Sequence, residues 1–463
     1  MEFIESKSGK KMLVTMEFIE SKSGKKMLVL DQFKYYFTAN RWRCYKKDCS
    51  ASVYLNEKND EIVKRKGDHF HDPCKTIHRQ KISIACKRKA IEDISQRPKK
   101  IILSEVYSSN TNVDINTQDI SAIRKCIYRA RRQTLPTNPT CISEVHDVID
   151  FLKPITSKNE NFLMINDINS NIIIFSCETN LSFLCKSETV YIDGTFSYCP
   201  NFFLQLFTLH GFINNHYVPL VFCLLPDKKQ ETYFKVLSVI TTKCDEYNLI
   251  LNPKIITIDF EIAIHNAVKL VWPSCAIKGC RFHLTQSWYR KIQELGLIVD
   301  YKQNNWLKHT FGLMYLNPED VSDCFVFDLM SDMPDNHKYS QYTDYLLETY
   351  IHENSKFPPK IWACMTESLS QTTNNCESFH SHFNQQFYKS HPNISIFLKI
   401  LVENVQTDTY IKINSANLNI PNTPKNKSTL LKCARTSKAI TDFKNKLISR
   451  YSYVKCVAFN YVK

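Results

Sequence analysis

Apolar and polar residues follow three different patterns along the chain. From Phe18 to His71 they alternate as in β-strands, broken by turn signals at "SKSGKK" and "NEKNDE". Residues 80–135 read as three helices, "KISIACKRKAIEDISQ", "PKKIILSEVYSS" and "TQDISAIRKCIYRARRQ", the last with Thr117 as its N-cap. Residues 170–265 alternate apolar strand blocks with helix-like blocks. The pattern predicts a small antiparallel β domain, a helical segment and an α/β domain.

The order of blocks in the α/β region predicts how its strands pair. The strands "TVYIDGTF", "FLQLFTLHGF" and "HYVPLVFCLLP" are followed by the helix "QETYFKVLSVITTKCDEYN" and the strand "KIITIDFE". Three consecutive strands, a crossover helix and a further strand are the order of an RNase H-like sheet, in which the first and fourth strands lie side by side. We therefore expect Asp193 and Asp259, at the ends of those two strands, to lie a few ångströms apart.

Paired carboxylates at the end of apolar strands need a compensating charge. Burial of an unpaired carboxylate is costly, and two like charges at one place favour cations between them, here Mg²⁺ or Mn²⁺. A two-metal site needs a third acid, which we expect in the helix "TTNNCESFHSHFNQQF". Glu377 shares a helical face with His380 and Asn384. Glu367 is the rival, but it precedes the polar "SQTTNN" break, and we favour Glu377.

Two residues between the second acid and this helix keep several roles open. Cys280 and His283 form a C-x2-H pair at the start of a helix. Two ligands are too few for a zinc site, so a stapling or DNA-contact role is as open as a metal role. The role of His380 is equally open.

The N-terminal β region carries a candidate zinc site. Cys44, Cys49, His69 and His71 have the spacing C-x4-C-x19-H-x-H, and two thiolates with two imidazoles suit tetrahedral zinc. A domain of about 55 residues also needs such a staple, because its core alone is marginal. The alternative is two core cysteines and two surface histidines.

The net charge of +14 is unevenly distributed. Residues 1–135 carry 29 basic and 16 acidic residues, 136–424 carry 21 and 29, and 425–463 carry 10 and one. Basic ends around an acidic middle suit a protein that binds a polyanion at its ends and divalent cations at its centre. The expected phosphate contacts are Lys46, Lys47, Lys64, Arg65, Arg124, Arg129, Arg131 and Arg132. A solvated helix face is the alternative for the four arginines.

Several classes of protein are disfavoured. With eight glycines and neither GxxxxGK[ST] nor GxGxxG, an ATPase or a Rossmann enzyme does not fit. No apolar stretch is long and clean enough for a membrane span, and we expect an intracellular protein with reduced thiols. Residues 1–14 and 16–29 are both "MEFIESKSGKKMLV". We expect the second copy to fold and residues 1–15 to be disordered and dispensable.

Two resemblances to known families follow from these motifs. Phe18, Leu28, Tyr36, Trp42, Cys44 and the closing His pair are similar to the FLYWCH zinc finger, over residues 16–74. "DGTF", "IDFEIAIHNAV", "CRFH" and "NNCESFHSHFN" occur in the order of the MULE (Mutator-like) transposase domain, over residues 186–390. The resemblance implies an RNase H-like fold with a helical insertion at about 284–365, and a triad of Asp193, Asp259 and Glu377 using Mg²⁺ or Mn²⁺.

The resulting expectation is a nuclear DNA transposase or a descendant of one. The expected domains are the zinc finger (16–74), a basic, helix-turn-helix-like segment (78–135), the transposase domain (186–390) and a basic helical segment (391–463). Structural zinc and catalytic Mg²⁺ or Mn²⁺ are the expected cofactors. Double-stranded DNA and a second copy of the chain are the expected partners, with no membrane. The alternative is a domesticated, non-catalytic, zinc-dependent DNA-binding regulator.

Overall fold

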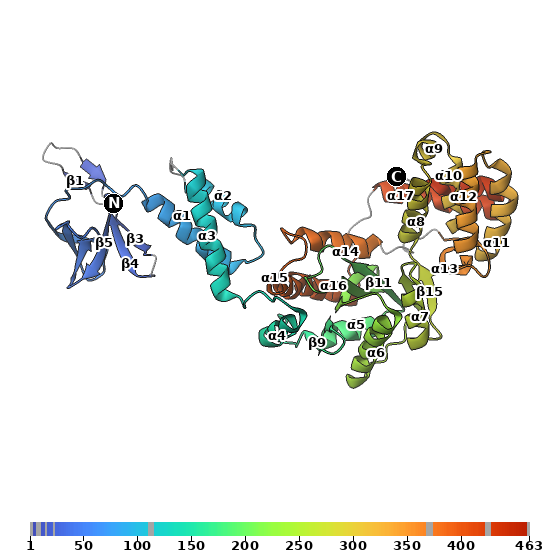
Figure 1. Cartoon of the computed structure of the whole chain (residues 1–463), viewed down its shortest axis with the longest axis horizontal. Coiled ribbons are helices and arrows are strands. Elements are labelled where there is room, and N and C mark those ends of the chain that lie inside the picture. Colours follow the sequence, from blue (N-terminus) through green and yellow to red (C-terminus); the bar gives the residue numbers. More distant parts are fainter. Residues whose placement is uncertain are drawn as a thin grey trace. The chain divides into compact units, whose positions relative to one another are not determined.

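The computed structural model describes residues 3–5, 11–13, 16–21, 24–109, 115–366, 374–421 and 427–460. The chain forms two compact units, Met1–Thr137 and Asn138–Lys463, each with its own cores (Figure 1). In the described part of the chain, no helix is long and apolar enough to cross a membrane.

The first unit begins with a six-stranded antiparallel sheet whose strands pair in sequence order. The strands are β3 (Met16–Glu20), β4 (Lys26–Leu30), β5 (Phe33–Thr38), β6 (Arg41–Cys44), β7 (Ser52–Leu55) and β8 (Ile62–Lys66). The turns between β4 and β5 and between β5 and β6 have two residues each, Asp31–Gln32 and Ala39–Asn40, all with positive φ. This geometry matches the right-handed twist of paired strands. Leu28, Trp42 and Val53 are buried in the core of this sheet.

The first copy of the duplicated segment contributes two short paired strands among the residues of it that the structure describes. β1 (Phe3–Glu5) pairs with β2 (Lys11–Leu13), and Phe3 lies opposite Leu13. In the second copy Phe18 lies opposite Leu28, which is the same register shifted by fifteen residues. The local sequence therefore specifies the same pairing twice.

Three helices complete the first unit, as the hydrophobic pattern predicts. They are α1 (Ile77–Glu92), α2 (Pro98–Ser108) and α3 (Thr117–Thr134), packed around Ile82, Ile101 and Ile127. The N-cap of α3 is Asn116 and not Thr117. The Asn116 side chain accepts from the backbone N–H of Asp119, and the Asp119 carboxylate accepts from the backbone N–H of Asn116.

The second unit is built on a mixed seven-stranded sheet with the order β15-β14-β11-β12-β13-β10-β9. The strands are β9 (Leu163–Asp167), β10 (Ile172–Phe175), β11 (Thr189–Thr195), β12 (Gln205–Ile213), β13 (His216–Leu225), β14 (Ile255–Ile258) and β15 (Ala276–Gly279). β14 is parallel to both of its neighbours, β11 and β15, and the other pairs are antiparallel. The sheet includes β9 and β10, so it begins before residue 186, where the sequence predicts the domain to start.

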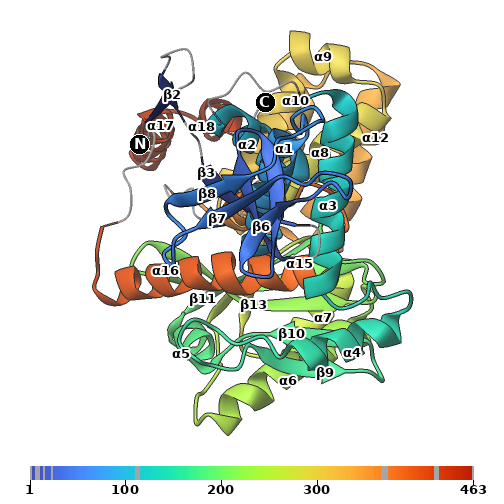
Figure 2. The same cartoon turned by 90° about the vertical axis from the view of Figure 1, so that its left-hand side faces the viewer.

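Helices cover both faces of this sheet (Figures 1 and 2). The helices α14 (Asn374–Gln385), α15 (Ile394–Lys399) and α16 (Thr407–Asn417) lie on one side, and α6 (Gln230–Glu246) and α7 (Ile262–Val271) on the other. Two further helices, α4 (Ile142–Leu152) and α5 (Glu178–Lys186), pack against the same cores. The edge that carries the candidate acids lies at the carboxyl ends of β11 and β14.

A helical subdomain follows the sheet and is completed by the C-terminal helices. Its helices are α8 (Arg281–Glu294), α9 (Ile298–Gln303), α10 (Trp306–His309), α11 (Pro318–Asp323), α12 (His337–Leu346) and α13 (Pro359–Trp362). Residues of α17 (Lys427–Lys444) and α18 (Arg450–Val457) share its core around Trp288, Trp362 and Tyr453. The described helices between residues 391 and 463 therefore pack on the sheet and on the helical subdomain.

Candidate functional site

The strand register brings Asp193 and Asp259 to equivalent positions on neighbouring strands. Thr189 of β11 pairs with Ile255 of β14, and Tyr191 pairs with Thr257. Extending this parallel register by two residues puts Asp193 opposite Asp259, on strands that lie about 4.8 Å apart. Asp193 is buried, whereas the side chain of Asp259 is half-exposed just beyond the end of β14. The edge can therefore present one anchored and one accessible carboxylate.

Glu377 comes from the first turn of α14, which packs across β11. Cys376, Phe383 and Phe387 are buried on the side that faces the sheet, as their spacing predicts. Glu367, the rival acid, lies outside the described residues.

His283 lies between the three carboxylates. Its Nδ1 is 3.6 Å from Asp259 Oδ1, and its Nε2 is 3.4 Å from Glu377 Oε1 and 4.0 Å from Asp193 Oδ1. Burial alone lowers the pKa of this imidazole, but the Cys280 thiol and the two aspartates outweigh it and raise the pKa to about 10. His283 therefore lies where a protonated imidazole would balance part of the negative charge of the three carboxylates.

A chain of buried polar groups lies behind Asp193. His380 Nδ1 is 3.1 Å from Asp193 Oδ2, and its Nε2 is 3.1 Å from Thr208 Oγ1. The same hydroxyl lies 2.8 Å from His210 Nε2 and 3.3 Å from the carbonyl oxygen of Asp193. His380, Thr208 and His210 are all buried. These contacts fix both the side chain and the backbone of Asp193.

A second set of contacts ties the two acid-bearing loops together. Tyr233 OH donates to Glu261 Oε1 at 3.1 Å and accepts from Gln205 Nε2 at 2.9 Å. Lys228 Nζ is 3.1 Å from Glu261 Oε2 and 4.4 Å from the centre of the Phe196 ring. Phe196 follows the Asp193 strand and Glu261 follows Asp259, so Lys228 bridges the two loops.

The space beside Gly194 is used by this network. A Cβ at position 194 would lie 2.8 Å from Gln205 Oε1. The glycine therefore leaves room for the Gln205 amide, which continues to Tyr233.

Cys44, Cys49, His69 and His71 converge in the first unit. Among the described residues they are the group of potential ligands whose atoms all lie within 4.8 Å of one another. Cys44 Sγ is 3.3 Å from His71 Nε2, Cys49 Sγ is 3.3 Å from His69 Nδ1, and the two nitrogens are 3.2 Å apart. Tetrahedral zinc with ordinary bond lengths separates such atoms by about 3.3–3.6 Å. The group fits a zinc ion.

Neighbouring residues orient both imidazoles. His71 Nδ1 lies 2.9 Å from the Asp72 carbonyl, which only accepts, so the proton is on Nδ1 and Nε2 is left for a metal. His69 Nε2 lies 2.7 Å from Tyr35 OH, and its ring stacks on Phe33 with centroids 3.7 Å apart. Burial lowers the pKa of His69, which keeps the imidazole neutral and able to bind metal.

The residues predicted to contact DNA are exposed, with one exception. Lys46, Lys47, Lys64 and Arg65 are exposed around the zinc group, and Arg124, Arg129 and Arg132 are exposed on α3. Arg131 is buried, and its guanidinium donates to the carbonyls of Ala90, Asp93 and Gln96 at 3.1, 3.0 and 2.7 Å. The prediction of DNA contact is wrong for Arg131, which instead closes the C-terminal end of α1.

Comparison with known families supports part of the expected identity. The MULE transposase domain matches residues 189–287, from the strand that carries Asp193 to the helix that carries His283. This part of the chain is therefore similar to a transposase domain. No match to the FLYWCH family is found. No curated protein matches the sequence.

The sequence patterns do not identify the residues that orient the candidate ligands or connect the loops around them. Tyr35, Asp72, Thr208, Gln205 and Lys228 carry no motif and no distinctive spacing. Their contacts join residues at least fifteen positions apart, except for the neighbours Asp72 and His71 and the pair Thr208 and His210 on β12. Pairing of β11 with β12, which puts Asp193 opposite Thr208, is the one signal that could have found Thr208.

Proposed function

We propose that the chain is a DNA transposase-like protein that cuts and joins phosphodiester bonds on an RNase H-like fold. The observation that carries the proposal is the register of β11 and β14, which puts Asp193 opposite Asp259, inside the segment similar to a MULE transposase domain. An antiparallel β11-β12-β13 meander followed by a parallel β14 is the strand order expected for this fold.

Asp193, Asp259 and Glu377 would hold the catalytic metals. Their oxygens are the ligands that Mg²⁺ and Mn²⁺ prefer. Bound there, the two ions would activate an attacking oxygen, from water or a 3′-hydroxyl, and stabilise the leaving one. His380 and Thr208 would hold Asp193 in place. His283 lies where it can balance the acids before metal binds.

We further propose that the first unit binds double-stranded DNA. A zinc-bound sheet of the FLYWCH type would present Lys46, Lys47, Lys64 and Arg65 to phosphates, and α3 would add its exposed arginines. These residues lie in residues 1–135, which carry 29 basic and 16 acidic residues. The protein would act in the nucleus, where its substrate lies, and as an oligomer if two DNA ends are joined.

Metal-dependent cleavage tests the proposal. The purified full chain is incubated with Mg²⁺ or Mn²⁺ and DNA bearing candidate terminal repeats, and nicking is measured. Asp193→Asn and Asp259→Asn should each abolish cleavage. Asp335→Asn, an exposed aspartate of the helical subdomain, serves as the matched control and should cleave like the unmodified protein.

The same experiment separates the enzyme from a regulator. Zinc-dependent DNA binding without cleavage, unaffected by Asp193→Asn and Asp259→Asn, would identify a non-catalytic DNA-binding protein. Cleavage that survives both substitutions would show that the triad is wrongly assigned.

A further inference from the structure

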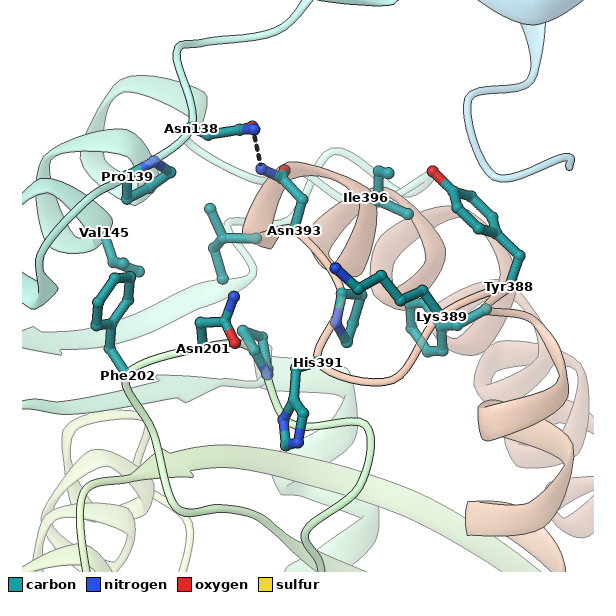
Figure 3. Close-up of a pocket in the computed structure, with 14 residues that line it drawn as sticks. Asn138, Pro139, Val145, Asn201, Phe202, Tyr388, Lys389, His391, Asn393 and Ile396 are labelled. Carbon is teal, nitrogen blue, oxygen red and sulfur yellow. Dashed lines mark hydrogen bonds between the residues drawn. The ribbon is translucent and has the colours of Figure 1, made fainter. Parts of the chain in front are cut away.

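A cavity of about 340 Å³ opens in the second unit, beside the segments that follow two of the acids (Figure 3). One wall is the loop after β11, with Pro200, Asn201 and Phe202. The opposite wall is the segment after α14, from Phe387 to Ile396, and Asn138 and Pro139 close the top. The volume lies within the range of small-ligand sites, about 300–1,000 Å³. Nothing in the proposed metal chemistry uses this cavity.

The lining suits an anion that carries a flat ring. The described residues around the cavity include no carboxylate, and the side chain of Lys389 reaches toward the middle (Figure 3). Phe202 stands on the far wall, and the residue is 44% exposed. The amides of Asn138 and Asn201 add donors and acceptors at the rim. The Lys389 ammonium suits the phosphate of a nucleotide, the face of the Phe202 ring suits its base, and the amides suit the polar edge of the base.

The two walls are fixed to each other before any ligand binds. The backbone N–H of His391 donates to the Ser197 carbonyl at 3.1 Å, and His391 Nδ1 donates to the Cys199 carbonyl at 3.1 Å. At the top, Asn393 Nδ2 donates to Asn138 Oδ1 at 2.5 Å (Figure 3). A preformed cavity loses less entropy on binding than one that must be assembled.

Phe202 is held in an unfavourable backbone conformation. Its φ is +77°, a region that bulky residues rarely adopt and that glycine adopts freely. Strain of this kind clusters at ligand-binding positions, because the surrounding structure must maintain it. A half-exposed aromatic ring at a strained position is poorly explained by packing, since the ring is not buried.

We propose that this cavity receives one unstacked nucleotide of a DNA single strand, with its base against Phe202 and its phosphate at Lys389. The inference rests on the proposed function and adds to it a contact away from the cut. From Glu377 to the end of α14 at Gln385 the chain runs eight residues, or about 12 Å along the helix axis, and the cavity lining begins just beyond, at Phe387. If the nucleotides between the cut and the cavity stay stacked at about 3.4 Å each, the unstacked nucleotide lies about three to four positions from the scissile bond.

Single-strand binding by the full chain tests the proposal. The probe is an oligonucleotide with 2-aminopurine placed at successive positions of a single-stranded tail, titrated in the absence of divalent metal. Emission should change at one position, and Phe202→Leu should weaken affinity about fivefold or more. Lys389→Gln should remove about one phosphate contact. The slope of log affinity against log salt concentration should then become shallower by about 0.7.

Two kinds of control separate binding from folding. Phe234→Leu, an exposed aromatic on α6, and Lys186→Gln, an exposed lysine at the end of α5, should bind like the unmodified protein. Phe202→Gly should melt at the same or a higher temperature, because glycine tolerates the positive φ, and yet bind the strand more weakly. If the Phe202 and Lys389 variants bind the strand with the same affinity as the unmodified chain, the proposal is overturned. This is also the result expected if the cavity binds a peptide and not a nucleotide.

Failure of this inference is distinguishable from failure of the proposed function. Asp193→Asn should leave the position-specific emission change intact, because Asp193 does not line the cavity. If cleavage depends on metal but Phe202→Leu binds the strand as well as the unmodified chain, the nucleotide site is rejected and the proposed enzyme is supported. A position-specific emission change without cleavage in any metal would keep the nucleotide site and reject the proposed enzyme.

Discussion

His380 Nδ1 lies 3.1 Å from Asp193 Oδ2, and the other oxygen of that carboxylate, Oδ1, faces His283 at 4.0 Å. A carboxylate only accepts, so His380 donates through Nδ1. One oxygen of Asp193 is thus occupied by a buried imidazole and the other is directed to the centre of the acid cluster. The division explains how a buried carboxylate can be held in one orientation.

Substitutions of His380 should show whether its Nδ1 contact positions Asp193 or whether the side chain only fills space. Asparagine can replace the Nδ1 donor and glutamine reaches the Nε2 position. We expect His380→Gln to lower Mn²⁺ affinity and cleavage rate by about 10- to 100-fold, as is typical when a residue behind a metal ligand is lost. His380→Asn should stay near the unmodified protein. Equal losses for both variants would mean that the Nδ1 contact does not position Asp193; Mn²⁺ titration supplies the measurement.

Gly279→Ala should disturb the loop of the second acid. The new Cβ would lie 2.3 Å from Cζ of Phe260, the residue after Asp259. That ring packs at 5.2 Å on Phe357, so it has little room to move. We expect unfolding free energy to fall by about 1–3 kcal/mol in urea titrations.

A compensating substitution checks the cause of that loss. Phe260→Leu combined with Gly279→Ala removes the clash and should recover part of the stability relative to Phe260→Leu alone. Simple addition of the two single losses would show that the glycine and the ring do not interact.

Loss of the zinc group should affect the first unit only. Cys49→Ser should release zinc and increase hydrogen exchange across residues 16–66, because a sheet of this size has a small core. Tyr35→Phe removes the group at 2.7 Å from His69 and should weaken zinc binding by about 10- to 100-fold. The neighbour Tyr36, which is 40% exposed, supplies the control Tyr36→Phe. Zinc content unchanged by Cys49→Ser would rule out the assigned ligand set.

Acidification should destabilise the protein through His210. Burial, and then the charges of His380 and Lys412, lower its pKa well below the ordinary value. Below about pH 6.5 the unfolded chain binds a proton that the folded chain does not, so stability falls with falling pH by at most about 1.4 kcal/mol per pH unit. His210→Gln removes this titration. Its melting temperature should drop less between about pH 7.5 and about pH 5.5 than that of the unmodified chain; parallel curves would contradict the assignment.

Two arginines of α3 should behave in opposite ways. Arg131→Ala removes the donor to three carbonyl oxygens and should destabilise the first unit, measured by thermal melting. Arg132→Ala should leave the melting temperature unchanged and reduce the salt dependence of DNA binding by a slope of about 0.9. A loss of DNA affinity at unchanged stability in Arg131→Ala would restore its predicted role.

Local patterns were enough for the elements and for the zinc group. Alternation and helical spacing predict the strands between residues 16 and 66 and all three helices of the first unit, because these patterns depend on neighbours within a few residues. The repeated hairpin makes the point most directly, since one fourteen-residue sequence pairs in the same register twice. The spacing of Cys44, Cys49, His69 and His71 predicts their convergence because a short antiparallel meander offers few other arrangements.

The order of residues alone identifies the candidate chemistry: two aspartates that end apolar strands, a glutamate on an amphipathic helix and a Cys/His group. Tertiary structure decided what surrounds them. His283 came to lie between the acids, His380 behind Asp193, and Arg131 inside a helix bundle, because each position depends on contacts across dozens of residues. A basic residue has the same local pattern whether it faces solvent or closes the end of a helix, and only packing separates the two.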